Sequence, residues 1–150
     1  MPGDVFAPPT ILTLPARTKL LDALLTHGFQ IDETWTEQNP MAKDAVMRLT
    51  HHSYPTMPLD LLFANDPQSQ SALTHRHVLQ LFGISLCVCG PEDLILLKLK
   101  ASRARDFEDV LGVVKNPHIQ LDLDYLRTWA SQLGLQGELS YILHTAGIGR

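Results

Sequence analysis

The sequence predicts an α/β fold in which strands and helices alternate first and helices alone follow. Two observations support this. Up to residue 89, short apolar runs are bounded by turn residues, which is typical of strands. From residue 91 onward, apolar residues recur every three or four positions, which is typical of helices. At 150 residues we expect one domain, comprising an irregular arm (1–9), an α/β part (10–90) and a helical part (91–145).

The N-terminal arm is rich in proline and glycine, so irregular structure is expected there. A short apolar strand is expected over residues 10–14. A helix follows, because Pro15 suits a first helical turn, leucines recur on one face, and Gly28 supplies a stop signal.

Three further strands are expected over residues 29–31, 45–49 and 57–64. The segment 32–43 between the first two is polar and contains a proline, so it is interpreted as a loop. A short helix is expected over 66–76, because Asp-Pro is a favourable N-cap and first-turn pair.

The remaining elements are a hairpin and four helices. The hairpin joins 78–81 to 84–89 through Phe-Gly. A helix begins at Pro91, where the following Glu and Asp complement the helix dipole, and a second ends before Pro117. The last two helices are expected over 125–133, after Asp122 or Asp124 as N-cap, and over 137–144; these ranges complete the helical part.

Composition narrows the function classes. The formal net charge is -4, which leaves no basic surface of the kind that binds bulk DNA or RNA. Cys87 and Cys89 lie two apart on one strand face, so they are not expected to pair with each other, and we interpret both as small buried side chains. No signal-peptide pattern or long apolar run is present, so we expect a reduced, cytoplasmic protein without membrane association.

Asp60 is the first candidate functional residue. It lies inside the otherwise apolar run 59–64. Burying an acid among Leu and Phe is costly unless a metal ion, a proton or a hydrogen-bond donor compensates it. The alternative is a carboxylate at a sheet edge that faces water. We expect Asp60 to lie on a central strand, with its side chain directed toward a cleft that Lys98 also borders.

A second group of charged residues lies on the two helices after residue 91. Lys98 lies on an otherwise apolar helix, so it either extends into solvent or reaches a phosphate. Asp106 and Asp109 are three residues apart and share a helical face, just after Arg103 and Arg105. This group either forms ion pairs that hold one helix against the next or lines a cleft.

The stretches 91–101 and 103–110, together with Asp60, resemble the later two thirds of a small nucleotidyltransferase-like domain. Such domains occur in minimal nucleotidyltransferases and in abortive-infection or toxin–antitoxin systems. The resemblance covers residues 10–143 and implies a mixed β-sheet with flanking helices and a C-terminal helical tail.

The resemblance also implies roles for individual residues. Asp60 corresponds to the family's third catalytic carboxylate and Mg²⁺ ligand. Lys98, Arg105, Asp106 and Asp109 correspond to positions that bind the nucleoside triphosphate. The family's early Gly-Ser turn and Asp-x-Asp strand have no counterpart in residues 1–30. Metal-assisted phosphoryl transfer needs several carboxylates, so one is too few.

Three functional hypotheses follow. The first is a truncated or degenerate nucleotidyltransferase-like protein that retains part of a nucleotide cleft but is inactive alone. The second is an antitoxin-like or scaffolding module that binds a protein partner. The third is an active nucleotidyltransferase whose missing ligands come from a second chain. Because the family's first strand and helix are missing, we expect an uncovered sheet edge and hence a homodimer or a protein partner. The alternative is that the arm over residues 1–9 folds back and shields this edge, with its prolines blocking further pairing.

Overall fold

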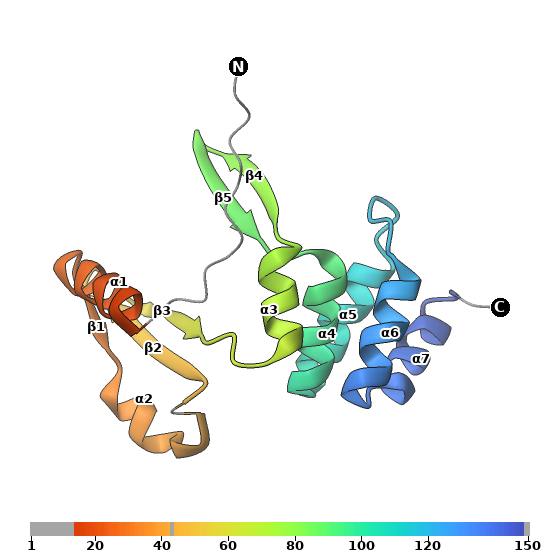
Figure 1. Ribbon diagram of the computed structural model, residues 1–150, viewed down its shortest axis with the longest axis horizontal. Coiled ribbons are helices and arrows are strands. Elements are labelled where there is room, and N and C mark those ends of the chain that lie inside the picture. The colour runs from red at the N-terminus through yellow and green to blue at the C-terminus, as the bar shows by residue number, and fades with distance from the viewer. Residues whose placement is uncertain (1–13, 43, 149–150) are drawn as a thin grey trace. The chain divides into compact units, whose positions relative to one another are not determined.

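A computed structural model describes residues 14–42 and 44–148 (Figure 1). The chain is α/β and divides into two compact units, Met1–Pro67 and Gln68–Arg150, which are described separately. The expected arm over 1–9 and residues 10–13 of the expected first strand lie outside the described residues. Each described helix is too short or too polar to span a lipid bilayer.

The first unit contains two helices, a 3₁₀ turn and three strands. They are α1 (Leu14–Thr26), β1 (Phe29–Ile31), α2 (Glu33–Gln38), η1 (Pro40–Ala42), β2 (Val46–His51) and β3 (Tyr54–Leu62). The expected stop of α1 is confirmed, because Gly28 has φ +87° and turns the chain into β1. Leu14, expected at the end of a strand, is instead the first residue of α1.

The three strands form an antiparallel sheet in the order β1-β2-β3. Leu49 on β2 is fully buried and lies opposite Ile31 on β1 and Leu59 on β3. Among the described strands, β3 is therefore at the end of the sheet. Asp60 therefore lies on an edge strand of the described sheet, and the central strand of that sheet is β2.

The loop expected over 32–43 is wrong, because α2 and η1 occupy most of it. The side chain of Asp32 accepts a hydrogen bond from Trp35 N at 2.9 Å and so caps the first turn of α2. Glu33 in that turn complements the helix dipole. The capping signal was present in the sequence, but the polar composition concealed it.

The second unit consists of one hairpin and five helices. They are α3 (Pro67–Thr74, which begins at the boundary), β4 (His77–Leu81), β5 (Ile84–Val88), α4 (Pro91–Ala101), α5 (Ala104–Val114), α6 (Leu123–Leu133) and α7 (Gln136–Thr145). The expected hairpin is confirmed. Its two turn residues, Phe82 at φ 51° and Gly83 at φ 77°, both have positive φ, as a tight hairpin turn with the twist of the strands requires.

The helices α4 to α7 form the hydrophobic core of the second unit, and Figure 1 shows them packed side by side. All four contribute buried aliphatic side chains: Ile95, Leu96, Leu99, Val110, Val114, Leu126, Ala130, Leu139, Ile142 and Leu143. Of the two N-caps considered for α6, the structure uses Asp122, whose side chain accepts from Tyr125 N at 2.9 Å. Gly134, at φ 70°, ends the helix as expected.

Two expectations about the strands need correction. The five described strands pair only antiparallel, in a three-stranded sheet and a separate hairpin, so the mixed sheet is not found among them. Cys87 and Cys89 are exposed rather than buried. The reason is that the hairpin strands pack mainly on each other and not on the helical core.

Candidate functional site

The candidate site lies in the second unit, where α4 is followed by α5. The start of α4 has Pro91 in its first turn, with the acids Glu92 and Asp93. Ile95 and Leu99 face the core from this helix, while Lys98 is only half-buried at its edge. The helix periodicity therefore places the Lys98 side chain beside the core and not inside it.

A short break between α4 and α5 brings the next charged residues back toward Lys98. Ser102 adopts a left-handed conformation at φ 55°, and its N–H donates to the carbonyl of Lys98. Arg103 is then the N-cap residue of α5, and Asp106 and Asp109 follow on that helix. Asp106 shares the buried face of α5 with Val110.

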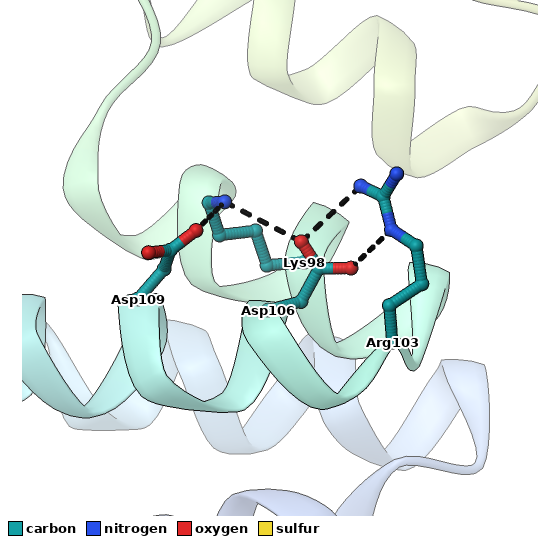
Figure 2. Close-up of polar contacts among 4 residues, drawn as sticks. All are labelled: Lys98, Arg103, Asp106 and Asp109. Carbon is teal, nitrogen blue, oxygen red and sulfur yellow. Dashed lines mark hydrogen bonds and ion pairs between the residues drawn. The ribbon is translucent and has the colours of Figure 1, made fainter.

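Figure 2 shows the resulting charge cluster, defined as Lys98, Arg103, Asp106 and Asp109. The Lys98 ammonium donates to Asp109 Oδ2 at 2.6 Å and to Asp106 Oδ1 at 3.4 Å. Arg103 binds Asp106 with two groups, Nε to Oδ2 at 2.6 Å and Nη2 to Oδ1 at 3.2 Å. Both oxygens of the buried Asp106 carboxylate are therefore held by cations.

The contacts in the cluster shift the pKa values of Lys98, Arg103 and Asp106 toward the charged forms. The hydrogen bond from Arg103 is the main reason that the pKa of Asp106 lies below its ordinary value, although desolvation opposes this. The hydrogen bond to Asp109 is the main reason that the pKa of Lys98 is raised. Arg103 is stabilised in its charged form by Asp106.

Arg105 is not part of this cluster. It is exposed on the first turn of α5 and forms no hydrogen bond or ion pair with another residue in the described ranges. The structure thus brings Lys98, Asp106 and Asp109 together, while Arg103, rather than Arg105, binds the buried carboxylate. The sequence pattern did not distinguish the two arginines.

Asp60 belongs to the first unit and has its own cation. Arg48, directly opposite on β2, donates from Nε to Oδ1 and from Nη2 to Oδ2, both at 2.7 Å. The Arg48 guanidinium also lies over the Trp35 ring, 4.5 Å from its centroid. A metal ion, a proton or a hydrogen-bond donor is expected to compensate the Asp60 charge, and in the structure Arg48 is that donor.

The Arg48 hydrogen bonds hold the pKa of Asp60 below its ordinary value. Because both carboxylate oxygens accept from Arg48, the charge that a Mg²⁺ ion would require from Asp60 is already offset by the guanidinium. Within residues 14–42 and 44–148, His, Cys, Asp and Glu side chains do not gather in groups of three or more that could hold a metal ion.

Sequence reasoning missed a polar network around Asp93, which is 2% exposed at the start of α4. Its Oδ1 accepts from Tyr125 Oη at 2.8 Å and from Gln68 Nε2 at 3.3 Å. Ser71 Oγ lies 3.0 Å from the same Tyr125 hydroxyl and 3.1 Å from Nδ1 of His75. Desolvation is the main cause that raises the pKa of Tyr125 to about 12.

This network joins α3, α4 and α6, so the sequence alone carried only a weak signal for it. The signal was Asp93, the second of two acids in the first turn of α4. Complementing the helix dipole does not by itself require this acid to be buried. Gln68 is fully buried, and its Oε1 has no hydrogen-bond partner among the described residues.

The charge cluster has one evident chemical capability. An ammonium group carries three N–H donors, and Lys98 uses two of them within the described residues. One donor therefore remains for an incoming acceptor such as a phosphate oxygen. The carboxylates around it are already neutralised by Lys98 and Arg103, so repulsion of an anion is reduced.

Comparison of the chain with protein-family models, with curated proteins and with solved structures found no match.

Proposed function

We propose that this chain is a degenerate nucleotidyltransferase-like protein that binds a nucleoside triphosphate at the charge cluster and transfers no nucleotide by itself. The supporting observation is that Lys98 contacts both Asp106 and Asp109. These are three of the four residues for which the resemblance implies nucleotide binding. The fourth, Arg105, is exposed next to Asp106 and has no neutralising partner among the described residues.

The proposed lack of transfer rests on the carboxylates. Asp60 is bound at both oxygens by Arg48, and Asp106 is bound at both oxygens by Arg103. An arginine that binds both oxygens of a carboxylate offsets its negative charge and occupies part of its lone pairs, so the carboxylate is a weaker cation ligand and a weaker base. Both acids are therefore poorer metal ligands than two-metal catalysis requires.

Calorimetric titration of the chain with ATP, with and without Mg²⁺, tests the binding. We expect saturable binding that weakens roughly fivefold or more in Arg105→Gln, because one charge-assisted contact is lost. Arg105 is the best position to change, since it supports no described contact and the fold should be unaffected. Lys115→Gln removes the same charge from an exposed position at the other end of α5 and is the matched control.

Equal affinities of Arg105→Gln and Lys115→Gln, or no heat of binding at all, would contradict the proposed site. Transfer is tested separately by incorporation of radiolabelled nucleotide into protein or RNA. We expect none. Incorporation that disappears in Asp60→Ala would instead favour an active enzyme, completed by a second chain.

A protein-interaction module is the second candidate function. The observation that favours it is the exposed apolar surface of the hairpin β4–β5, where Leu79 is 52% exposed and Ile84 is 61% exposed. An antitoxin-like or scaffolding role would use this surface and would not require nucleotide. A chain that binds no ATP but retains a partner in the absence of nucleotide fits this candidate.

A further inference from the structure

The hairpin β4–β5 has two chemically different faces. The register pairs Leu79 with Leu86 and Leu81 with Ile84, so these four side chains share one face. This group is named the aliphatic face. All four of its residues are exposed, between 41% and 61% of their surface. The turn residue Phe82, 94% exposed, extends the apolar surface at the tip.

The opposite face is more polar, and two of its polar side chains form a hydrogen bond with each other. It carries the pairs Val78 with Cys87 and Gln80 with Ser85. Gln80 Nε2 donates to Ser85 Oγ at 2.6 Å, so the two polar groups at its outer end already bind each other. The hairpin is therefore amphipathic, with its apolar side opposite the Gln80–Ser85 contact.

The helical core does not cover the aliphatic face. The hairpin strands pack mainly on each other, and within the second unit Figure 1 shows the hairpin projecting beyond the helices. An isolated two-stranded hairpin is only marginally stable in water. Exposed strands are normally protected by charged side chains, yet residues 77–90 contain no Asp, Glu, Lys or Arg. Both facts indicate that another surface covers this hairpin.

We infer that the aliphatic face is a homodimer interface, in which two copies of the chain pack their hairpins face to face. The lack of charge supports this occupant, because a charged peptide or a nucleic acid would find no complementary charge on residues 77–90. A second copy presents the same uncharged aliphatic surface, which is self-complementary across a twofold axis. Homodimer interfaces are also more apolar than the interfaces of non-obligate complexes.

The expected dimer is weak. Specific interfaces usually bury about 800 Å² on each partner, with roughly 20 to 30 residues a side. The aliphatic face and Phe82 together provide far fewer residues. We therefore expect a monomer–dimer equilibrium that depends on protein concentration in the micromolar range. The inference goes beyond the proposed nucleotide site and is independent of it, since no member of the charge cluster lies on the hairpin.

Sedimentation velocity of the full chain from low to high micromolar concentration tests the inference. We expect the average mass to rise toward that of a dimer. Leu79→Lys should raise the dimer dissociation constant roughly tenfold or more, because it would bury a charge in the interface. Val78→Lys is the matched control. It is the adjacent residue, 46% exposed, on the opposite face, and should leave the dissociation constant within about twofold.

Hydrogen–deuterium exchange of the hairpin amides identifies the occupant if a variant misfolds. Protection that rises with the concentration of the wild-type chain supports a second copy. Protection that is independent of concentration means that another part of the same chain covers the face, and this overturns the inference. A strict monomer with an unprotected hairpin, or equal effects of Leu79→Lys and Val78→Lys in two folded variants, also overturns it.

Discussion

Arg48 on β2 lies directly opposite Asp60 on β3 and binds both of its carboxylate oxygens at 2.7 Å. The pair is only partly exposed, with 26% of the Arg48 side chain and 33% of the Asp60 side chain accessible. Trp35 covers the guanidinium from one side. The acid that stands out in the sequence thus helps to join two strands of the first unit.

We predict that the Arg48–Asp60 pair stabilises the first unit by a coupling free energy of about 1 kcal/mol. A double-mutant cycle of Arg48→Met and Asp60→Asn measures it. The chain has two tryptophans, Trp35 and Trp129, one in each unit, so urea unfolding of the first unit can be followed by Trp35 fluorescence in a Trp129→Phe background.

A poorly aligned ion pair serves as the control for this cycle. Arg127 Nη1 lies 3.6 Å from Asp124 Oδ1, and their side chains are 56% and 97% exposed. We expect its coupling to be within about 0.3 kcal/mol of zero. A coupling for Arg48 and Asp60 that is no larger than this would mean that Asp60 is energetically free to bind another ligand.

The lowered pKa of Asp60 predicts a loss of stability in acid. A carboxylate whose pKa is lower in the folded state contributes stability above its unfolded pKa of about 3.9, and this is lost as the pH falls through the folded pKa. The urea midpoint of the first unit should therefore decrease as the pH is lowered from about 5 to below the unfolded Asp pKa of about 3.9. Asp60→Asn should flatten this dependence, and an unchanged slope would refute the assignment.

The Asp93 network predicts a structural role for the Tyr125 hydroxyl. Tyr125→Phe removes a 2.8 Å hydrogen bond to a buried carboxylate and should lower the free energy of unfolding by about 1–3 kcal/mol. Tyr141→Phe is the matched control, because Tyr141 is 65% exposed on α7, and its effect should stay within about 0.5 kcal/mol. Chemical denaturation followed by Trp129 fluorescence measures both.

Alkaline titration provides a separate test of Tyr125. Its pKa is raised to about 12, so the neutral hydroxyl is favoured in the folded state. The associated stability is fully present below the unfolded pKa of about 10 and is lost as the pH rises toward 12. In ultraviolet titration of the three tyrosines, one should ionise late, and this late phase should be absent in Tyr125→Phe.

Replacing each of two glycines by alanine should have opposite effects on the stability of the chain. Gly112 lies inside α5 with no atom within 4 Å of an added Cβ, so Gly112→Ala should stabilise the chain by about 0.5–1 kcal/mol. Gly28 has φ +87°, a backbone conformation that L side chains rarely adopt, and an added Cβ would clash with the His52 ring. Gly28→Ala should therefore destabilise the chain. Thermal unfolding of both variants tests the contrast, and a stabilised Gly28→Ala would contradict the described turn.

The secondary structure was largely predictable, because its signals are local. Proline at the start of α4, the Phe82-Gly83 turn of the hairpin and the glycine after α6 each act within a few residues of where they stand. The exception, α2, also has a local cause. Its cap, Asp32, was outweighed by the polar composition of the following residues.

The sequence by itself determined the α/β class, most element boundaries and the acids of interest. The tertiary structure decided what those acids contact. Asp60 meets Arg48 only because the strand register places them opposite each other, and Asp106 meets Lys98 only because α4 and α5 pack together. Such partners depend on strand register and helix packing, which join residues on different secondary-structure elements and which the pattern within one element does not encode.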